Sequence, residues 1–258
     1  MPALLNTVDP DGLLEYSVVF PDRSLNHMSA KFQCVMRDIS SILKEVYAAD
    51  AVALVPGGGT FAMEAVARQI AVDKRVMVLR NGWFSFRWSQ IFEAGGIPAS
   101  ETVMKARRTC NDAKASFAPA PIEEVVAKIS ADQPDVVFAP HVETSSGMIL
   151  PDAYIKAVTD AVHVYGGLFV LDCIASGCAW VDMPATGLDL LISAPQKGWS
   201  ASPSAGMVML SEAGLAAVQA CQSTSFSVVL VKLLSIRVAY EHCCHAYHAT
   251  MPTAARTA

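Results

Sequence analysis

The chain has 258 residues, of which 53% are hydrophobic and 17% charged, and its formal net charge is −5 at pH 7. This composition can supply a large apolar core, and without a run of Lys or Arg it argues against partners such as nucleic acid or an anionic membrane. The seven cysteines form no CxxC pair and the N-terminus has no signal-peptide pattern, so we expect a cytoplasmic protein with reduced thiols.

Apolar runs and amphipathic stretches alternate along the chain. Between Ser29 and Tyr47, apolar residues recur at helical spacing, which predicts a helix with one buried face. Further helices are predicted over 60–71, 84–96 and 152–167. Short apolar runs typical of buried strands occupy 51–56, 75–81, 135–140, 168–172, 188–193 and 206–211. The segment 105–121 has neither pattern and is predicted to be a surface loop.

This alternation predicts the fold class. Strands that are apolar throughout are buried on both faces, which indicates an α/β fold with a mostly parallel sheet and helices on both faces, a three-layer αβα sandwich. Ligands of such sheets bind beyond the carboxyl ends of the strands. The candidate site therefore comprises the residues that follow the strands, namely Gly57–Thr60, Asn81–Phe84, His141–Thr144, Asp172 and Gln196–Lys197.

Three glycines in "PGGGTFAMEA" lie between a predicted strand and a predicted helix. Backbone N–H groups and the helix dipole favour an anion there, and Thr60 adds a hydroxyl, so the turn suits a phosphate. An ordinary glycine turn explains the same residues. The stretch also matches a loose dinucleotide pattern, GxGxxA, which would indicate a nicotinamide-dependent oxidoreductase. That pattern requires an acid at the end of the next strand, where Arg80 and Asn81 stand instead.

Asp172 ends a predicted strand in "GGLFVLDCIAS", and Lys197 follows the apolar run "LLISAP". A buried carboxylate is costly unless a cation or hydrogen bonds meet it, and a desolvated lysine has a lowered pKa and can form a Schiff base. A turn-forming aspartate and a solvated loop lysine are the alternatives. Together with the glycine turn, the two residues match pyridoxal phosphate, which needs a phosphate cradle, an acid at its ring nitrogen and a lysine at its aldehyde.

Six separated stretches carry a resemblance to a known family. They are "PGGGTFAMEA", "RNGWFSFRW", "HVETSSG", "LDCIASGCAW", "SAPQKGWSASPSAG" and "AYHATMPT". The chain resembles the class V aminotransferases of the fold type I pyridoxal phosphate enzymes, most of all the alanine–glyoxylate and serine–pyruvate branch. The resemblance implies a cofactor-binding large domain over 29–258 after an N-terminal segment 1–28, with the C-terminal small domain largely absent.

The resemblance also implies roles for individual residues. Lys197 would hold the cofactor and move the proton during catalysis, and Asp172 would keep the pyridine nitrogen protonated. Phe84 and Ile174 would pack on opposite faces of the ring, and Thr144 would hydrogen-bond near the phenolic oxygen. The phosphate would be held by Gly58, Gly59, Thr60 and Gln196, with Tyr247 and Thr250 reaching the phosphate of a neighbouring subunit. A homodimer follows from this last pair.

The implied reaction moves an amino group from alanine or serine to a 2-oxo acid such as glyoxylate or pyruvate. A 2-aminoethylphosphonate transaminase and an inactive cofactor-binding remnant are the alternatives. The remnant is considered because the family's small domain supplies an arginine for the substrate carboxylate, whereas Arg256 stands in the terminal "TAARTA". A cysteine desulfurase is disfavoured, because Phe84 stands where that group needs a stacked histidine.

Two further features carry histidine. His141 opens "HVETSSG" and is either a neighbour of the cofactor or a structural residue at a strand end. His242, His245 and His248 surround the pair Cys243-Cys244, but their spacing matches no standard zinc site, so we expect no metal.

Overall fold

The structure, a computed structural model, describes His27 and residues 29–241. The main strands are β1 (Ala51–Pro56), β2 (Arg75–Arg80), β3 (Ser100–Lys105), β6 (Val136–Pro140), β9 (Leu168–Asp172), β10 (Leu190–Ser193) and β11 (Ala205–Leu210). Two small hairpins are formed by β4 (Arg107–Arg108) with β5 (Phe117–Ala118), and by β7 (Val142–Glu143) with β8 (Met148–Ile149). The helices are α1 (Ala30–Tyr47), α2 (Gly59–Ile70), α3 (Trp83–Gly95), α4 (Ile122–Asp132), α5 (Asp152–His163), α6 (Met183–Thr186), α7 (Glu212–Ala220) and α8 (Leu230–Glu241).

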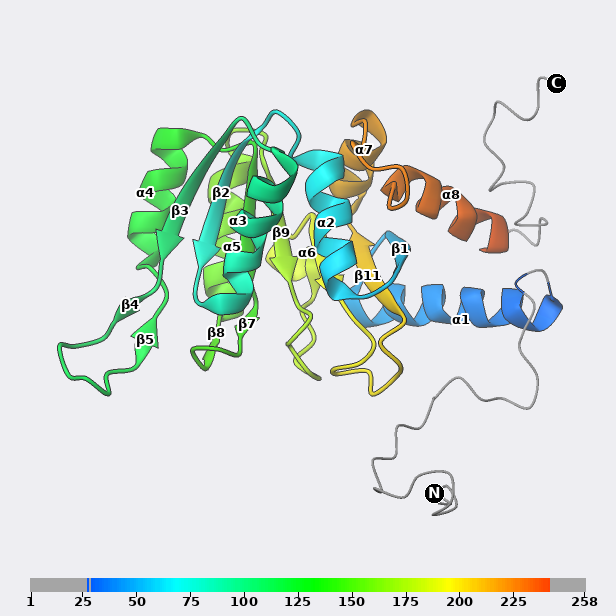
Figure 1. Cartoon of the computed structure of the whole chain (residues 1–258), viewed down its shortest axis with the longest axis horizontal. Coiled ribbons are helices and arrows are strands. Elements are labelled where there is room, and N and C mark those ends of the chain that lie inside the picture. Colours follow the sequence, from blue (N-terminus) through cyan, green and yellow to red (C-terminus); the bar gives the residue numbers. More distant parts are fainter. Residues whose placement is uncertain (1–26, 28, 242–258) are drawn as a thin grey trace, which may run out of the picture.

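The main strands form one seven-stranded sheet in the order β1-β11-β10-β9-β6-β2-β3. Neighbouring strands are parallel except where β11 pairs with β1 and with β10. The carboxyl ends of β1, β2, β6, β9 and β10 therefore share one edge, which is the lower edge of the sheet in Figure 1. The predicted mostly parallel α/β sheet is confirmed.

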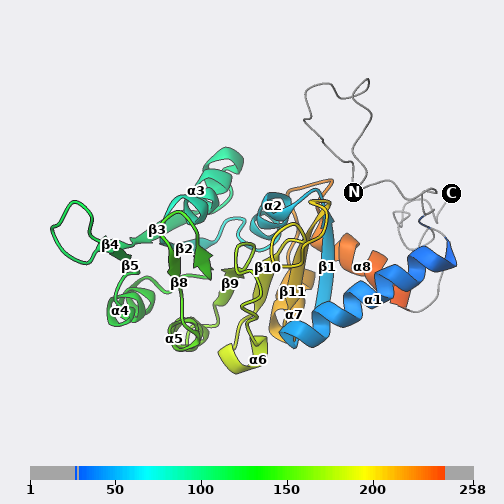
Figure 2. The same ribbon diagram turned by 90° about the horizontal axis from the view of Figure 1, so that it is seen from below.

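Two apolar cores cover the two faces of the sheet. In β6, Val136 and Phe138 belong to one core and Val137 and Ala139 to the other, because successive side chains of a strand point to opposite faces. Helices α2, α3 and α8 contribute to the first core, and α1, α4 and α5 to the second. In Figure 2, α2 and α3 accordingly lie on one side of the sheet and α4 and α5 on the other.

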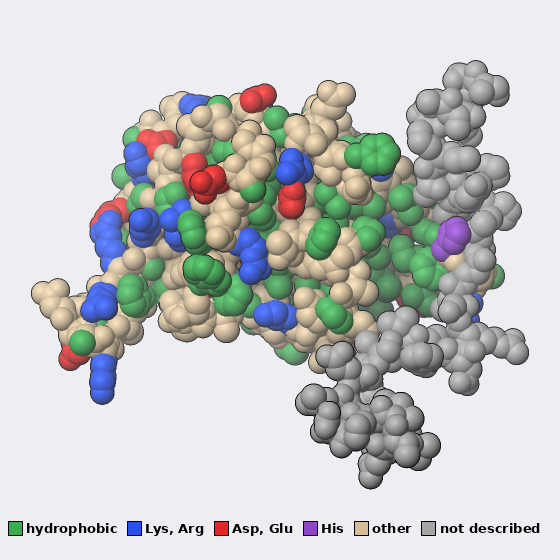
Figure 3. Space-filling view, viewed as in Figure 1, with side chains coloured by type: hydrophobic (Ala, Val, Ile, Leu, Met, Phe, Trp, Pro, Cys, Tyr) green, Lys and Arg blue, Asp and Glu red, His purple; other side chains and the backbone are tan. Residues whose placement is uncertain are grey.

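Helices α1 and α8 pack together beyond β1. Ser29 caps α1, since its hydroxyl accepts the N–H of Phe32 at 3.2 Å. The ring of Phe32 meets that of Tyr240 edge to face, with centroids 5.8 Å apart. The hydroxyl of Ser40 donates to the carboxylate of Glu241 at 2.6 Å. Apolar side chains gather between these two helices on the face drawn in Figure 3.

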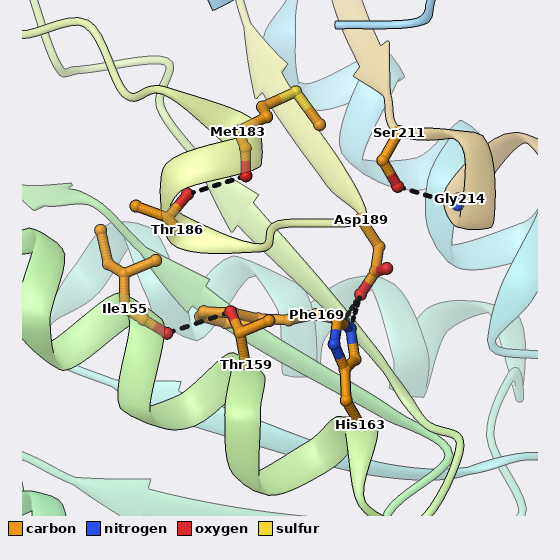
Figure 4. Close-up of polar contacts among 9 residues, drawn as sticks. All are labelled: Ile155, Thr159, His163, Phe169, Met183, Thr186, Asp189, Ser211 and Gly214. Atoms are coloured by element: carbon orange, nitrogen blue, oxygen red, sulfur yellow. Dashed lines mark hydrogen bonds and ion pairs between the residues drawn. The ribbon is translucent and has the colours of Figure 1, made fainter. Parts of the chain in front are cut away.

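A buried carboxylate fixes the opposite edge of the sheet, where β9 and β10 begin (Figure 4). Asp189 is 1% exposed, and its Oδ2 accepts the N–H of Phe169 at 2.8 Å. The Nε2 of His163, at the end of α5, lies 2.9 Å from the same oxygen. Burial raises the pKa of Asp189, and the hydrogen bond with His163 opposes that rise. These contacts tie α5, β9 and β10 together, so we assign the pair a structural role.

One strand of the sheet departs from the prediction. β3 pairs in parallel with β2 at the sheet's edge, yet no strand was predicted there. Its residues are exposed or half-buried and include Glu101 and Lys105, so the continuous apolar run that marks the central strands is missing. Within residues 29–241, no helix combines the length and apolar character that crossing a membrane requires.

Candidate active site

The candidate site is a cavity of about 100 Å³ at the carboxyl edge of the strands. Seven of the predicted site residues line it, namely Gly59, Thr60, Phe84, Asp172, Ile174, Gln196 and Lys197. They come from the starts of α2 and α3 and from the segments after β9 and β10, so folding brings together residues far apart in the sequence. Arg87, Val142 and Ala175 complete the lining.

The glycine turn forms the start of α2. Gly57 has a φ of +119°, in the region that favours glycine, and Gly58 is the extended residue before the helix. Gly59 has no room for a side chain, because a Cβ there would lie 2.5 Å from the Cδ1 of Ile174. The first N–H groups of a helix have no partner within it, so this turn presents donors at the cavity.

Asp172 supplies the cavity with a buried carboxylate, 7% exposed. Its Oδ1 accepts the N–H of Ile174 at 2.9 Å. Burial raises the pKa of Asp172 to about 6, against the opposing effects of the Ile174 hydrogen bond and of the charges on Arg87 and Lys197. A cation placed beside this carboxylate would stabilise its charged form and lower its pKa.

Lys197 lies in the segment that follows β10, with its Nζ 5.7 Å from the centroid of the Phe84 ring. The residue is exposed in this structure, so the desolvation expected from the sequence is not found. Among the described residues, the amine has no hydrogen-bond or ion-pair partner. The next residue, Gly198, approaches the backbone of Gly177 so closely that a Cβ would lie 2.0 Å from the Gly177 oxygen. The segment that carries Lys197 is therefore packed directly on the segment that follows Asp172.

Glu143 fixes the wall that Phe84 forms. This residue is fully buried in β7, and its Oε1 accepts the N–H of Phe84 at 3.0 Å. Its Oε2 accepts the N–H and the hydroxyl of Ser85 at 2.9 and 2.7 Å, and Ser145 donates to Oε1 at 2.6 Å. Burial alone would raise the pKa of Glu143, but the hydrogen bonds from Ser145, Ser85 and Phe84 outweigh it and the pKa is lowered. The carboxylate thus caps α3.

Three individually predicted or considered residues within the described part of the chain do not line the cavity, and others lie outside that part. Gly58 stands immediately before its rim, and Thr144 is exposed in the turn between β7 and β8. Tyr247 and Thr250 lie outside the described residues, as does the histidine and cysteine cluster at 242–248. His141 is 4% exposed and its Nδ1 lies 2.7 Å from the hydroxyl of Ser176, while burial lowers its pKa. It is therefore a buried structural residue beside the cavity.

No protein-family model matches the chain. It is 33% identical over 186 residues to a 2-aminoethylphosphonate–pyruvate transaminase of Burkholderia thailandensis, covering 70% of this chain and 46% of that one. It is 26% identical over 192 residues to an L-aspartate–glyoxylate aminotransferase of Paracoccus denitrificans, covering 71% of this chain and 44% of that one. The chain is a homologue of class V aminotransferases.

This aminotransferase homologue spans about half the length of the curated relatives it matches. Its fold is shared with the ureidoglycine–glyoxylate aminotransferase of Bacillus subtilis, with a TM-score of 0.71 at 21% identity over 88% of this chain and 58% of that one. The expected fold type I architecture is confirmed by this likeness.

For two residues of the aminotransferase homologue's site the sequence did not predict the role found: Glu143 lies within the predicted range His141–Thr144, whereas Arg87 lies outside every range predicted for the site. Glu143 stands in "HVETSSG", where an acid directly after a buried strand could have drawn attention. Arg87 lies three residues after Phe84 in α3, and helical residues at that spacing share one face. The side chain of Arg87 lines the cavity, and its Nη1 donates to the hydroxyl of Thr60 at 3.1 Å.

Proposed function

We propose that the chain is the large domain, 29–258, of a pyridoxal phosphate-dependent aminotransferase, preceded by the segment 1–28. In this proposal it transfers an amino group from a small amino acid, alanine or serine, to a 2-oxo acid such as glyoxylate or pyruvate. The observation that carries the proposal is one cavity lined by an unpaired lysine, a buried aspartate and the glycine start of a helix.

Two features of the cavity fit the cofactor. The Asp172 carboxylate is buried with a raised pKa, and a protonated ring nitrogen would supply the cation that stabilises it. The start of α2 offers N–H donors, and Gly59 has no side chain that could fill the space in front of them. This arrangement suits a phosphate. Gly58, Gly59, Thr60 and Gln196 would hold this phosphate.

The roles of the protein groups follow from this placement. When bound, pyridoxal phosphate supplies an aldehyde that reacts with amines and a pyridinium ring that withdraws electrons. The amine of Lys197 would hold the cofactor and then take the proton from the α-carbon of the amino acid. Phe84 and Ile174 would flank the ring and exclude water from it. Thr144, which stands outside the cavity lining in the turn between β7 and β8, would have to reach the phenolic oxygen from there.

A second candidate reaction is 2-aminoethylphosphonate–pyruvate transamination. It is favoured by the 33% identity to the Burkholderia thailandensis transaminase, which is named for that activity. Both candidates use the same cavity residues and differ in the amino donor. An inactive cofactor-binding remnant is a third outcome of the test below.

The test combines one variant with one half-reaction. Lys197→Ala should abolish the visible absorbance of bound cofactor, whereas Lys156→Ala, in an exposed ion pair with Asp160, should leave it unchanged. The wild-type protein is then mixed separately with alanine, serine and 2-aminoethylphosphonate. Loss of the aldehyde form with one donor identifies that donor. Conversion with none of them would overturn the activity and leave a binding remnant.

The proposal includes a homodimer in the cytoplasm. Its basis is the resemblance of Tyr247 and Thr250 to residues that reach the phosphate of a neighbouring subunit. Sedimentation of the purified chain with cofactor should give twice the mass of 27.5 kDa. A species of single mass at all concentrations would contradict the dimer.

A further inference from the structure

Arg87 places a guanidinium in the wall of the cavity. It lies one helical turn after Phe84, and its Cζ is 5.6 Å from the centroid of that ring. Its Nη1 donates to the Thr60 hydroxyl at 3.1 Å. Within the described residues no carboxylate forms an ion pair with Arg87. An arginine beside a cavity with this single side-chain hydrogen bond retains further N–H donors for a ligand.

The charges around the cavity favour an anion as that ligand. Arg87 and Lys197 both act on the carboxylate of Asp172 electrostatically, yet neither lies within ion-pair distance of it in the described structure. Two cations and one carboxylate leave the cavity lining with a positive balance. The planar fork of a guanidinium matches the oxygens of phosphate or carboxylate better than a lysine amine does.

The contact of Arg87 with Thr60 favours a phosphate over a carboxylate as the bound anion. Thr60 lies in the first turn of α2, so the hydrogen bond holds the guanidinium beside the start of that helix. The N–H groups and the dipole of a helix start favour a negative charge at this place. Hydroxyl, guanidinium and backbone donors thus converge on one end of the cavity, and a dianion uses all three.

We propose that Arg87 is a phosphate-binding residue of this site, which neutralises the phosphate of the cofactor together with Thr60 and the start of α2. This inference deepens the proposed function and rests on it. The phosphate would then be bound by a full positive charge from α3 as well as by the backbone and hydroxyl donors of α2. Arg87 would then also link the phosphate end of the cavity to the helix that carries Phe84.

The first experiment uses inorganic phosphate as the probe, on the full chain freed of cofactor. Calorimetric titration should show that Arg87→Gln weakens phosphate binding by about ten- to a hundredfold, as expected for the loss of hydrogen bonds to a charged group. Arg87→Lys should recover part of the affinity, because charge returns without the fork. Arg107→Gln removes an exposed arginine paired with Glu124 and should bind phosphate as the wild type does.

The second experiment compares pyridoxal phosphate with pyridoxal, which lacks the phosphate. Arg87→Gln should weaken binding of the first about as much as it weakens inorganic phosphate, and should leave binding of the second unchanged. Equal affinities of Arg87→Gln and wild type for both phosphate probes would overturn the inference. The inference would also be overturned if Arg87→Gln bound the cofactor as the wild type does but needed a higher amino acid concentration to convert it. That result would assign Arg87 to the substrate carboxylate.

The outcomes separate this inference from the proposed function. Should Lys197→Ala keep the wild-type cofactor spectrum while phosphate binding still depends on Arg87, the aminotransferase assignment fails and the anion site stands. Unfolding temperatures of the variants without ligand serve as the folding control. If Arg87→Gln is unfolded, the Arg87→Lys variant replaces it, and its affinities for pyridoxal phosphate and for pyridoxal are compared with those of the wild type.

Discussion

The carboxylate of Glu143 holds the backbone of Phe84, with its Oε1 accepting the Phe84 N–H at 3.0 Å. β7 thereby fixes the first turn of α3, and with it the ring that forms one wall of the cavity. Gly82 is part of the same arrangement, because a Cβ there would lie 2.2 Å from the hydroxyl oxygen of Ser145. The wall is set by a buried acid and does not rest on apolar packing alone.

Glu143→Gln should destabilise the protein. An amide offers one acceptor in place of two, and its NH₂ group faces an N–H donor, so we expect a loss of about 2–3 kcal/mol in the free energy of unfolding. Because the folded pKa of Glu143 is lowered, the carboxylate's contribution is present above its unfolded pKa and is lost as the pH falls through the folded pKa. Urea unfolding of both proteins at neutral and acidic pH measures this. An equal difference at all pH values would contradict it.

Asp172→Asn should stabilise the cofactor-free protein at pH 8. The folded pKa of about 6 exceeds the unfolded value of 3.8, so wild-type stability falls as the pH rises through this window, and the asparagine variant escapes that loss. A shift of this size corresponds to roughly 2–3 kcal/mol. Urea unfolding between pH 4 and pH 8 checks the expectation, with the exposed Asp38→Asn as control. The same variant should bind pyridoxal phosphate more weakly, since it lacks the negative charge.

Gly59→Ala should narrow the cavity. The new Cβ would lie 2.5 Å from the Cδ1 of Ile174, so the Ile174 side chain would have to move. Ile174 lines the cavity, and its displacement would change the shape of that cavity. We expect cofactor affinity to fall about tenfold. The double variant with Ile174→Val removes the clashing methyl and should recover affinity. Fluorescence titration of cofactor measures both, and equal affinities for the single and double variants would argue against this contact.

His163→Ala should lower stability without affecting the cavity. Asp189 would remain buried with one partner fewer, which costs about 1–3 kcal/mol. A double-mutant cycle with Asp189→Asn should show a coupling between the two side chains. Cofactor affinity should stay at the wild-type value, because the pair lies at the opposite edge of the sheet from the cavity. Additive effects in the cycle would refute a direct interaction.

The sequence predicted the central strands and most of the cavity residues because both can be recognised from short stretches of the chain. A parallel strand that is buried on both faces is apolar throughout, and the residue after it is placed by the strand itself, as with Asp172 after β9. The edge strand β3 is half solvated and therefore has no such pattern.

The role of Glu143 and the place of Arg87 in the site were missed for a different reason. The partners of Glu143 at Phe84 and Ser85 are 59 and 58 residues away in the sequence, so its role exists only once β7 and α3 have met. Arg87 touches Thr60, 27 residues earlier, across two helices. The helical spacing from Phe84 could have placed Arg87 on the same face, but the proximity of the two helices could not be read from either one.

The place of β1 in the sheet bears on how the protein is made. In the described structure its one neighbouring strand is β11, so residues 51–56 lack a hydrogen-bonding partner until residues 205–210 have left the ribosome. The parallel strands β2, β6 and β9 can associate earlier, since they neighbour one another. A nascent chain that stops before residue 205 would therefore leave the backbone of β1 without a neighbouring strand, and unpaired strand backbones favour aggregation.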